Sequence, residues 1–140
     1  MTGAGLADLF RLSKLQHLDL DSTLTSDDDL FYIKGRSSIK SLSLSNTAVT
    51  DAGLHYVGQM QQLTSLHLKG TRVTDSGLRH LRGLAQLKLL TISSTQVTDK
   101  GIEHLKTLTG LSSVDVRDTA VTTAGVNELK IVLPKCHVYR

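Results

Sequence analysis

The sequence repeats with a period of 24 residues, and this regularity constrains the fold more than any other feature. Three columns of the repeat are apolar at all six of their positions, and no insertion or deletion disturbs the register. Repeats of this length are typical of stacked units that bury a continuous core between neighbours. The columns are Leu6, Leu30, Leu54, Leu78, Ile102 and Val126; Leu9, Ile33, Val57, Leu81, Leu105 and Leu129; and Leu18, Leu42, Leu66, Leu90, Val114 and Val138.

Each unit combines a strand with a short helix. Residues 63–68 end in apolar and polar alternation, which predicts a strand with one buried face. Thr74 is placed to cap a helix, because its hydroxyl can accept a hydrogen bond from an otherwise unpaired amide. Asp75 then lies in the first helical turn, where the helix dipole favours a negative charge. Val73 and Leu78 have the spacing of a hydrophobic staple, which fixes how the chain enters the helix.

Stacking of such units predicts an α/β solenoid. Parallel strands line one side about 4.8 Å apart. Helices need more width than strands, so the stack curves with the strands on the concave side and the helices on the convex side. We expect one domain over residues 1–140. Its five units are 6–29, 30–53, 54–77, 78–101 and 102–125, followed by a partial C-terminal unit, 126–140.

The pattern resembles the leucine-rich repeat family, whose units carry Leu-x-x-Leu-x-Leu before a polar turn. Residues 39–44 have this form, with Ile in the first place. A further Thr-x-Val-Thr-Asp-x-Gly-Leu segment occurs at 47–54 and 71–78, and at 95–102 with Ile last. The resemblance covers nearly the whole chain. It implies a helix-backed solenoid of the kind found in substrate-receptor repeat domains and many bacterial repeat proteins.

One column departs from the family pattern. The family commonly has Asn in the turn after the strand, where its amide joins the backbones of neighbouring units. Threonine occupies that column here, and a hydroxyl offers fewer hydrogen bonds than an amide. We expect these threonines to be buried and structural, and to form an internal ladder with fewer bonds per residue. They are Thr23, Thr47, Thr71, Thr95 and Thr119.

Composition and charge narrow the class of protein. No apolar run approaches the roughly 20 residues of a membrane span, so no membrane partner is expected. Cys136 is the single cysteine, which excludes an internal disulfide framework and favours a reducing compartment; we expect a cytoplasmic protein. The net charge is +3, with −1 over residues 1–70 (six Lys or Arg, seven Asp or Glu) and +4 over residues 71–140 (ten and six). A surplus this small does not by itself indicate nucleic-acid binding.

The sequence offers no convincing catalytic grouping. Ser43 and His67 are neighbours at one strand spacing, as a nucleophile and a base would be. The carboxylates of Asp19 and Asp115, however, are each expected two strands from that histidine, about 10 Å away. An open arc also neither excludes water nor forms an oxyanion hole. We therefore expect a protein that is not an enzyme and that uses no cofactor and no small-molecule substrate.

Two groups of side chains superficially suggest a metal site. The three adjacent acids at residues 27–29 are better explained by a helix start, in which Ser26 caps and Asp29 completes a capping box. His80 and His104 share a column on the helix face, but their expected separation of about 10 Å is too wide for one metal ion. We expect both histidines to be solvated and no metal to be bound.

Two surfaces are candidates for binding a partner. On the concave face, small polar side chains let another backbone approach, and charged groups are arranged along the sheet. The candidate contacts there are Asp19, Asp21, His67, Lys69, Asp115, Arg117 and Tyr139. On the helix face, adjacent aromatic residues form a second candidate patch, which consists of Phe31, Tyr32 and Tyr56.

The leading hypothesis is a non-catalytic scaffold that binds a protein or peptide partner. The alternative, which the family resemblance permits, is a substrate-recognition segment of a larger assembly such as a ubiquitin ligase. Nucleic acid is the least favoured partner, because base-stacking aromatics are not interleaved with the basic residues. The residues leave open which of the two faces binds.

Overall fold

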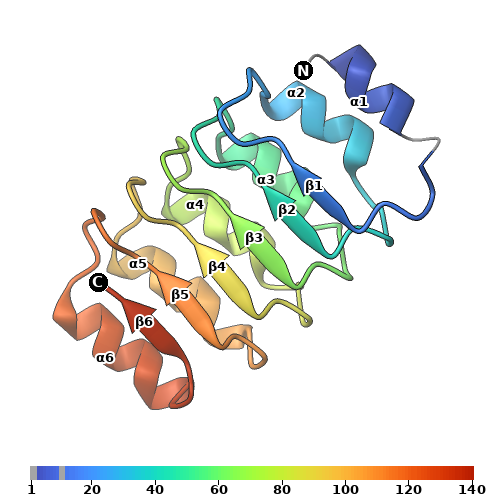
Figure 1. The fold of residues 1–140 in the computed structure, drawn as a ribbon. Coiled ribbons are helices and arrows are strands. Elements are labelled where there is room, and N and C mark those ends of the chain that lie inside the picture. The colour runs from blue at the N-terminus through green and yellow to red at the C-terminus, as the bar shows by residue number, and fades with distance from the viewer. Residues whose placement is uncertain (1–2, 10–11) are drawn as a thin grey trace.

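The structure is a computed structural model that describes residues 3–9 and 12–140. One sheet contains six parallel strands in chain order, and the helices lie together behind it (Figure 1). The strands are β1 (His17–Asp19), β2 (Ser41–Ser43), β3 (Ser65–His67), β4 (Leu89–Thr91), β5 (Ser113–Asp115) and β6 (His137–Tyr139). The α-helices are α1 (Gly3–Leu9), α2 (Asp27–Leu30), α3 (Asp51–Val57), α4 (Asp75–Leu78), α5 (Asp99–Ile102) and α6 (Thr123–Val132), and 3-10 turns follow three of them: η1 (Phe31–Ile33), η2 (Arg79–Leu81) and η3 (Glu103–Thr107).

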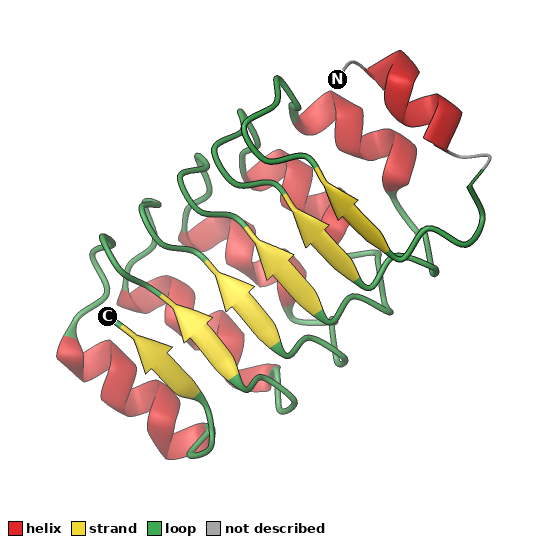
Figure 2. Ribbon diagram, in the orientation of Figure 1, coloured by secondary structure: helices red, strands yellow, loops and turns green. Residues whose placement is uncertain are grey.

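The strand register equals the sequence repeat. Leu18 pairs with Leu42, which pairs in turn with Leu66, so each step across the sheet is one period of 24 residues. Figure 2 shows the result as a regular succession of one strand and one helix, with the described chain progressing from one end of the stack to the other. The predicted α/β solenoid, with strands on one side and short helices on the other, is confirmed.

The core lies between the sheet and the helices. In β2 the central Leu42 is fully buried, whereas the flanking Ser41 and Ser43 are partly exposed on the other side of the sheet. The helices contribute the other two apolar columns, represented by Leu54 and Val57, which are also fully buried. One continuous apolar cluster therefore runs through all the units, as the periodicity predicts.

Carboxylates at the helix starts join neighbouring units, a role beyond the helix-dipole effect predicted from the sequence. Asp51 begins α3, and its side chain reaches the next unit: Oδ1 accepts from the amide of Thr74 at 2.7 Å, and Oδ2 accepts from the hydroxyl of Thr74 at 2.6 Å. The same hydroxyl accepts from the Ser76 amide and so caps α4 as predicted. The equivalent pairs are Asp27 with Thr50, Asp75 with Thr98, and Asp99 with Thr122.

In the first unit, the acceptor for the amide before the helix comes from the helix itself. The Ser26 amide donates to Oδ2 of Asp29 at 2.8 Å in a capping box, as predicted for this acidic run. Asp27 meanwhile serves the next unit by binding Thr50. The carboxylates of Asp27 and Asp29 are therefore both hydrogen-bonded to helix starts.

The threonine column closes turns inside each unit. Thr47 Oγ1 donates to the carbonyl of Leu44 at 2.7 Å, three residues earlier in the same unit. The prediction that these hydroxyls form a ladder between units is therefore wrong, because each hydroxyl donates its hydrogen bond to a carbonyl in its own turn. All five members make this bond: Thr47, Thr71 and Thr95 are buried as expected, whereas Thr23 and Thr119 are half-buried.

The carboxylate links leave no room for a side chain at the third helical position. A Cβ built on Gly101 would lie 2.5 Å from Oδ1 of Asp75, and one built on Gly77 would overlap Oδ1 of Asp51. The column is therefore glycine wherever the preceding unit supplies an aspartate. The Thr-Asp-x-Gly part of the repeat is thus a single structural device.

We expect Gly77→Ala to lower the free energy of unfolding by about 1–3 kcal/mol, because the new Cβ displaces the Asp51 carboxylate from Thr74. Asp51→Ala should cost a similar amount through loss of both hydrogen bonds. Urea denaturation of the double variant, Asp51→Ala with Gly77→Ala, is the decisive measurement. Because this variant has no carboxylate for the new Cβ to displace, its free energy of unfolding should fall by much less than the sum of the two single decreases. Strictly additive losses would show that the two residues do not meet. Ser76→Ala, at an exposed neighbour, is the control.

Candidate functional site

The concave face, which is the side of the sheet turned away from the helices, has two shallow hollows. The first has a volume of about 360 Å³ and lies over β1 to β3, between Asp19 and His67. The second has a volume of about 320 Å³ and lies over β3 to β6. Four candidate residues line the second hollow: His67, Asp115, Arg117 and Tyr139. Asp19 lines the first, whereas Asp21 and Lys69 line neither.

Apolar surface is exposed in the second hollow. The side chain of Leu89 is 43% exposed and that of Tyr139 is 55% exposed, although both belong to the strand layer. Ser113 is the direct partner of Leu89 in the next strand, and its small side chain leaves the space between them open. Leu89 is not among the contacts predicted from the sequence. The available signal was its place as the one apolar member of a column otherwise made of His and Ser: His17, Ser41, Ser65, Ser113 and His137.

Two candidate residues form a fork-like ion pair. Arg117 donates from Nε to Oδ1 of Asp115 at 2.9 Å and from Nη2 to Oδ2 at 2.7 Å. The arginine side chain is 62% exposed, whereas the aspartate side chain is only 13% exposed. Hydrogen bonds from Arg117 hold the pKa of Asp115 below its ordinary value, against an opposing effect of burial. Asp115 therefore positions the guanidinium at the edge of the hollow.

His67 is engaged by hydroxyl groups on both sides. Its Nε2 lies 2.9 Å from Ser65 Oγ, and its Nδ1 lies 3.1 Å from Thr91 Oγ1. Ser43, the other half of the suspected nucleophile and base pair, donates instead to Oδ1 of Asp21. The two residues expected to be neighbours in a catalytic pair are therefore each committed to other partners.

The acidic candidates of the first unit take part in turn structure. Asp19 Oδ1 accepts from the amide of Asp21 at 2.9 Å. Asp21 Oδ1 accepts from the amide of Ser45 at 2.7 Å, which ties the first turn to the second. Both carboxylates remain exposed on the concave side.

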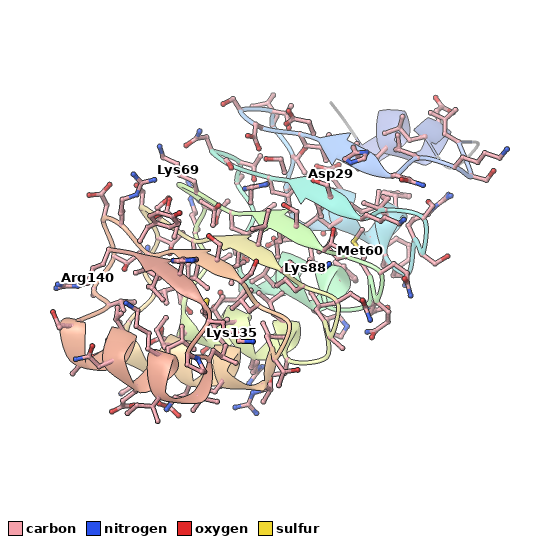
Figure 3. All side chains as sticks on the ribbon, turned by 60° about the horizontal axis from the view of Figure 1, so that its bottom comes forward. Asp29, Met60, Lys69, Lys88, Lys135 and Arg140 are labelled. Carbon is pink, nitrogen blue, oxygen red and sulfur yellow. The ribbon has the colours of Figure 1, made fainter. Side chains whose placement is uncertain are left out.

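Lys69 lies beyond the carboxyl end of β3 and makes no ion pair with any described residue. Figure 3 shows Lys69 on the same side of the sheet as Arg140, where the strands end. Lys88 and Lys135 lie on the opposite side, where the strands begin. These four basic side chains are therefore divided between the two ends of the strands.

The second candidate patch, Phe31, Tyr32 and Tyr56, is a contiguous aromatic cluster on the helix side. The Phe31 ring meets those of Tyr32 and Tyr56 edge-to-face, with centroids 5.7 and 5.8 Å apart. Lys34 Nζ lies 3.8 Å from the centroid of the Phe31 ring, so one aromatic face already holds a cation. The cluster continues through His55, whose ring contacts that of Tyr56.

The two helix-face histidines are half-buried rather than solvated, so that expectation is wrong. Burial lowers the pKa of His80, with a further lowering from Arg79, and it lowers the pKa of His104, with a further lowering from Arg82. Over the described part of the chain, no three His, Cys, Asp or Glu side chains are grouped to hold a metal ion. Nor does any helix there have the length and apolar character to cross a membrane.

A single sheet of in-register parallel strands, backed by short helices and open on its other side, defines a solenoid repeat protein. A model of the Leucine Rich repeat family matches residues 59–81. The structure and this match together show a leucine-rich repeat fold, which in general suggests a protein-interaction scaffold.

Solved structures extend the comparison. Internalin C2 of Listeria monocytogenes is similar over 95% of this chain, with a TM-score of 0.77 and 26% identity. A leucine-rich repeat protein of Leptospira interrogans (TM-score 0.68, 14% identity) and actin-binding site 2 of leiomodin-1 (TM-score 0.72, 15% identity) each match over 96% of the chain and share its fold. The chain covers 54%, 39% and 89% of these structures, so it spans about half of the internalin. No curated protein matches the sequence.

We expect the carboxyl group of Asp115 to titrate below about 3.9, the usual value for an aspartate, in an NMR pH titration. Because its folded pKa is lowered, the pair stabilises the protein above the unfolded pKa, and this stability is lost as the pH falls through the folded pKa. Arg117→Gln should raise the titration midpoint of Asp115. Lys69→Gln removes a nearby unpaired cation and should leave it almost unchanged; equal shifts in both variants would contradict a specific ion pair.

Proposed function

We propose that this leucine-rich repeat protein is a non-catalytic module that binds a protein or peptide partner on its concave face. The observation that carries the proposal is the second hollow, where exposed Leu89 and Tyr139 lie beside the fixed guanidinium of Arg117. Aromatic and arginine side chains that surround a pocket are the usual anchors of protein interfaces. When a partner covers a water-exposed leucine in the middle of a sheet face, the burial of its apolar surface contributes favourably to the free energy of binding.

The contacts around His67 support a binding role over catalysis. Its ring nitrogens face the hydroxyls of Ser65 and Thr91, and no carboxylate of the described residues hydrogen-bonds to it. Among the described residues that line the same hollow, the one acid is Asp115, and it is bound by Arg117. An arrangement of satisfied polar groups around an apolar patch suits recognition.

A narrower proposal is that the chain is the substrate-recognition segment of a larger assembly such as a ubiquitin ligase. It rests on the family resemblance and would use the same concave surface. We also propose a cytoplasmic location, since the single cysteine, Cys136, is a free thiol. Mass spectrometry of proteins crosslinked to the chain in cells would test both, through the partners and the compartment found.

We expect the double substitution Leu89→Ser and Tyr139→Ser to weaken partner capture at least tenfold, because it removes the exposed anchors. Both side chains are about half exposed, so the melting temperature should change little. The assay is quantitative crosslinking and affinity capture from a lysate of the source cells.

The matched control is Phe31→Ser with Tyr32→Ser, which changes the aromatic cluster on the helix side. Proteins captured by this control but lost from the concave variant support the proposal. The reverse pattern would assign binding to the second candidate patch and overturn it.

A further inference from the structure

The concave face is electrically divided along the direction of the stack. From the start of each strand to two residues past its end, the units of β1 and β2 carry Asp19 and Asp21 and no Lys or Arg, a formal charge of −2. The corresponding part of β3 to β5 carries Lys69, Arg117 and Asp115, for which 2 − 1 gives +1. A partner lying across the strands therefore meets an acidic zone first and a basic zone later.

The separation of these zones suits an extended chain. β1 and β5 are four strand spacings apart, which is about 19 Å. An extended peptide advances about 3.3 Å per residue, so about six residues bridge that distance. The zones are thus within reach of one short peptide segment.

The basic zone adjoins the apolar surface. Arg117 uses Nε and Nη2 on Asp115, and the remaining guanidinium N–H groups are available to a partner carboxylate because the side chain is mostly exposed. Leu89 and Tyr139 flank the hollow just beside it. An apolar side chain in the hollow would place the neighbouring peptide residue close to Arg117.

We infer that the partner of the concave face is an extended peptide segment with a basic residue over β1 and, about six residues away, a bulky apolar residue next to an acidic one over β4 to β6. The inference rests on the proposed function and specifies its ligand. Charge complementarity sets the direction in which the segment lies, and the apolar residue in the hollow supplies the desolvated contact.

The test begins with selection of a random 12-residue phage-displayed library on the immobilised 140-residue protein. Enriched sequences are then synthesised with a fluorophore, and their affinities are measured by anisotropy at physiological salt. We expect a basic residue separated from an apolar and acidic pair by about six positions.

The informative variant exchanges the ion pair, Asp115→Arg with Arg117→Asp. It keeps the net charge and the attraction between the two side chains but reverses which charge faces the partner. We expect it to weaken binding at least tenfold, and Leu89→Ser to do the same. Lys100→Glu, at an exposed site on the helix side, is the control and should change the affinity less than twofold.

The outcomes separate this inference from the proposed function. Peptides that bind the concave face and are lost in Leu89→Ser, yet show no ordered charges or tolerate the exchanged pair, would overturn the inference alone. The same holds if no peptide is enriched while protein capture still requires Leu89 and Tyr139. Peptides whose binding survives replacement of both anchors would overturn the inference and the proposed function together.

Discussion

The carboxylate at the first position of α2, α3, α4 and α5 makes the interaction on which the stacking of the helix layer depends. Asp51 binds both the amide and the hydroxyl of Thr74 and so fixes the start of one helix to the start of the next. The backbone ladder of the sheet makes the corresponding connection on the strand side. Each unit is therefore held to its neighbour at two places on either side of the apolar core, which maintains the register of the stack.

This division of roles explains why the concave face is free to carry function. The core columns, the aspartate links and the glycines lie at or behind the sheet, and no outward strand residue takes part in them. Positions such as Leu89, Asp115 and Tyr139 can therefore differ from unit to unit without disturbing these stacking interactions. The irregular chemistry of one face on a regular frame is what allows a specific partner to be recognised.

The sequence predicted the parts of this structure that depend on periodicity. Burial of Leu42 between Ser41 and Ser43, and the cap at Thr74, follow from alternation and local hydrogen bonding, which are visible within a few residues. The link from Asp51 to Thr74 was missed because the residues are 23 positions apart and meet only through the way two units stack.

Side-chain detail at the candidate site was the least predictable part. Asp115 and Arg117 were expected as separate contacts, but the two-residue spacing at the end of a strand lets the guanidinium fold back onto the carboxylate. Likewise, the half-burial of His80 depends on packing against neighbouring units, which the helical periodicity of one unit does not encode.

Two breaks in the repeat show that the requirement is on the backbone groups rather than on particular residues. At the start of α2, Asp29 accepts from the Ser26 amide, whereas in later units a preceding aspartate accepts from the equivalent amide. Just before α6, Arg140 Nε donates to the carbonyl of Val121 at 3.0 Å, whereas in earlier units a backbone amide of the next unit donates to the equivalent carbonyl. Figure 3 shows these two side chains near opposite ends of the stack. Because an unpaired buried backbone group is costly, a side chain supplies the partner at each of these two positions, and the departures from the repeat at Asp29 and Arg140 have the same physical reason.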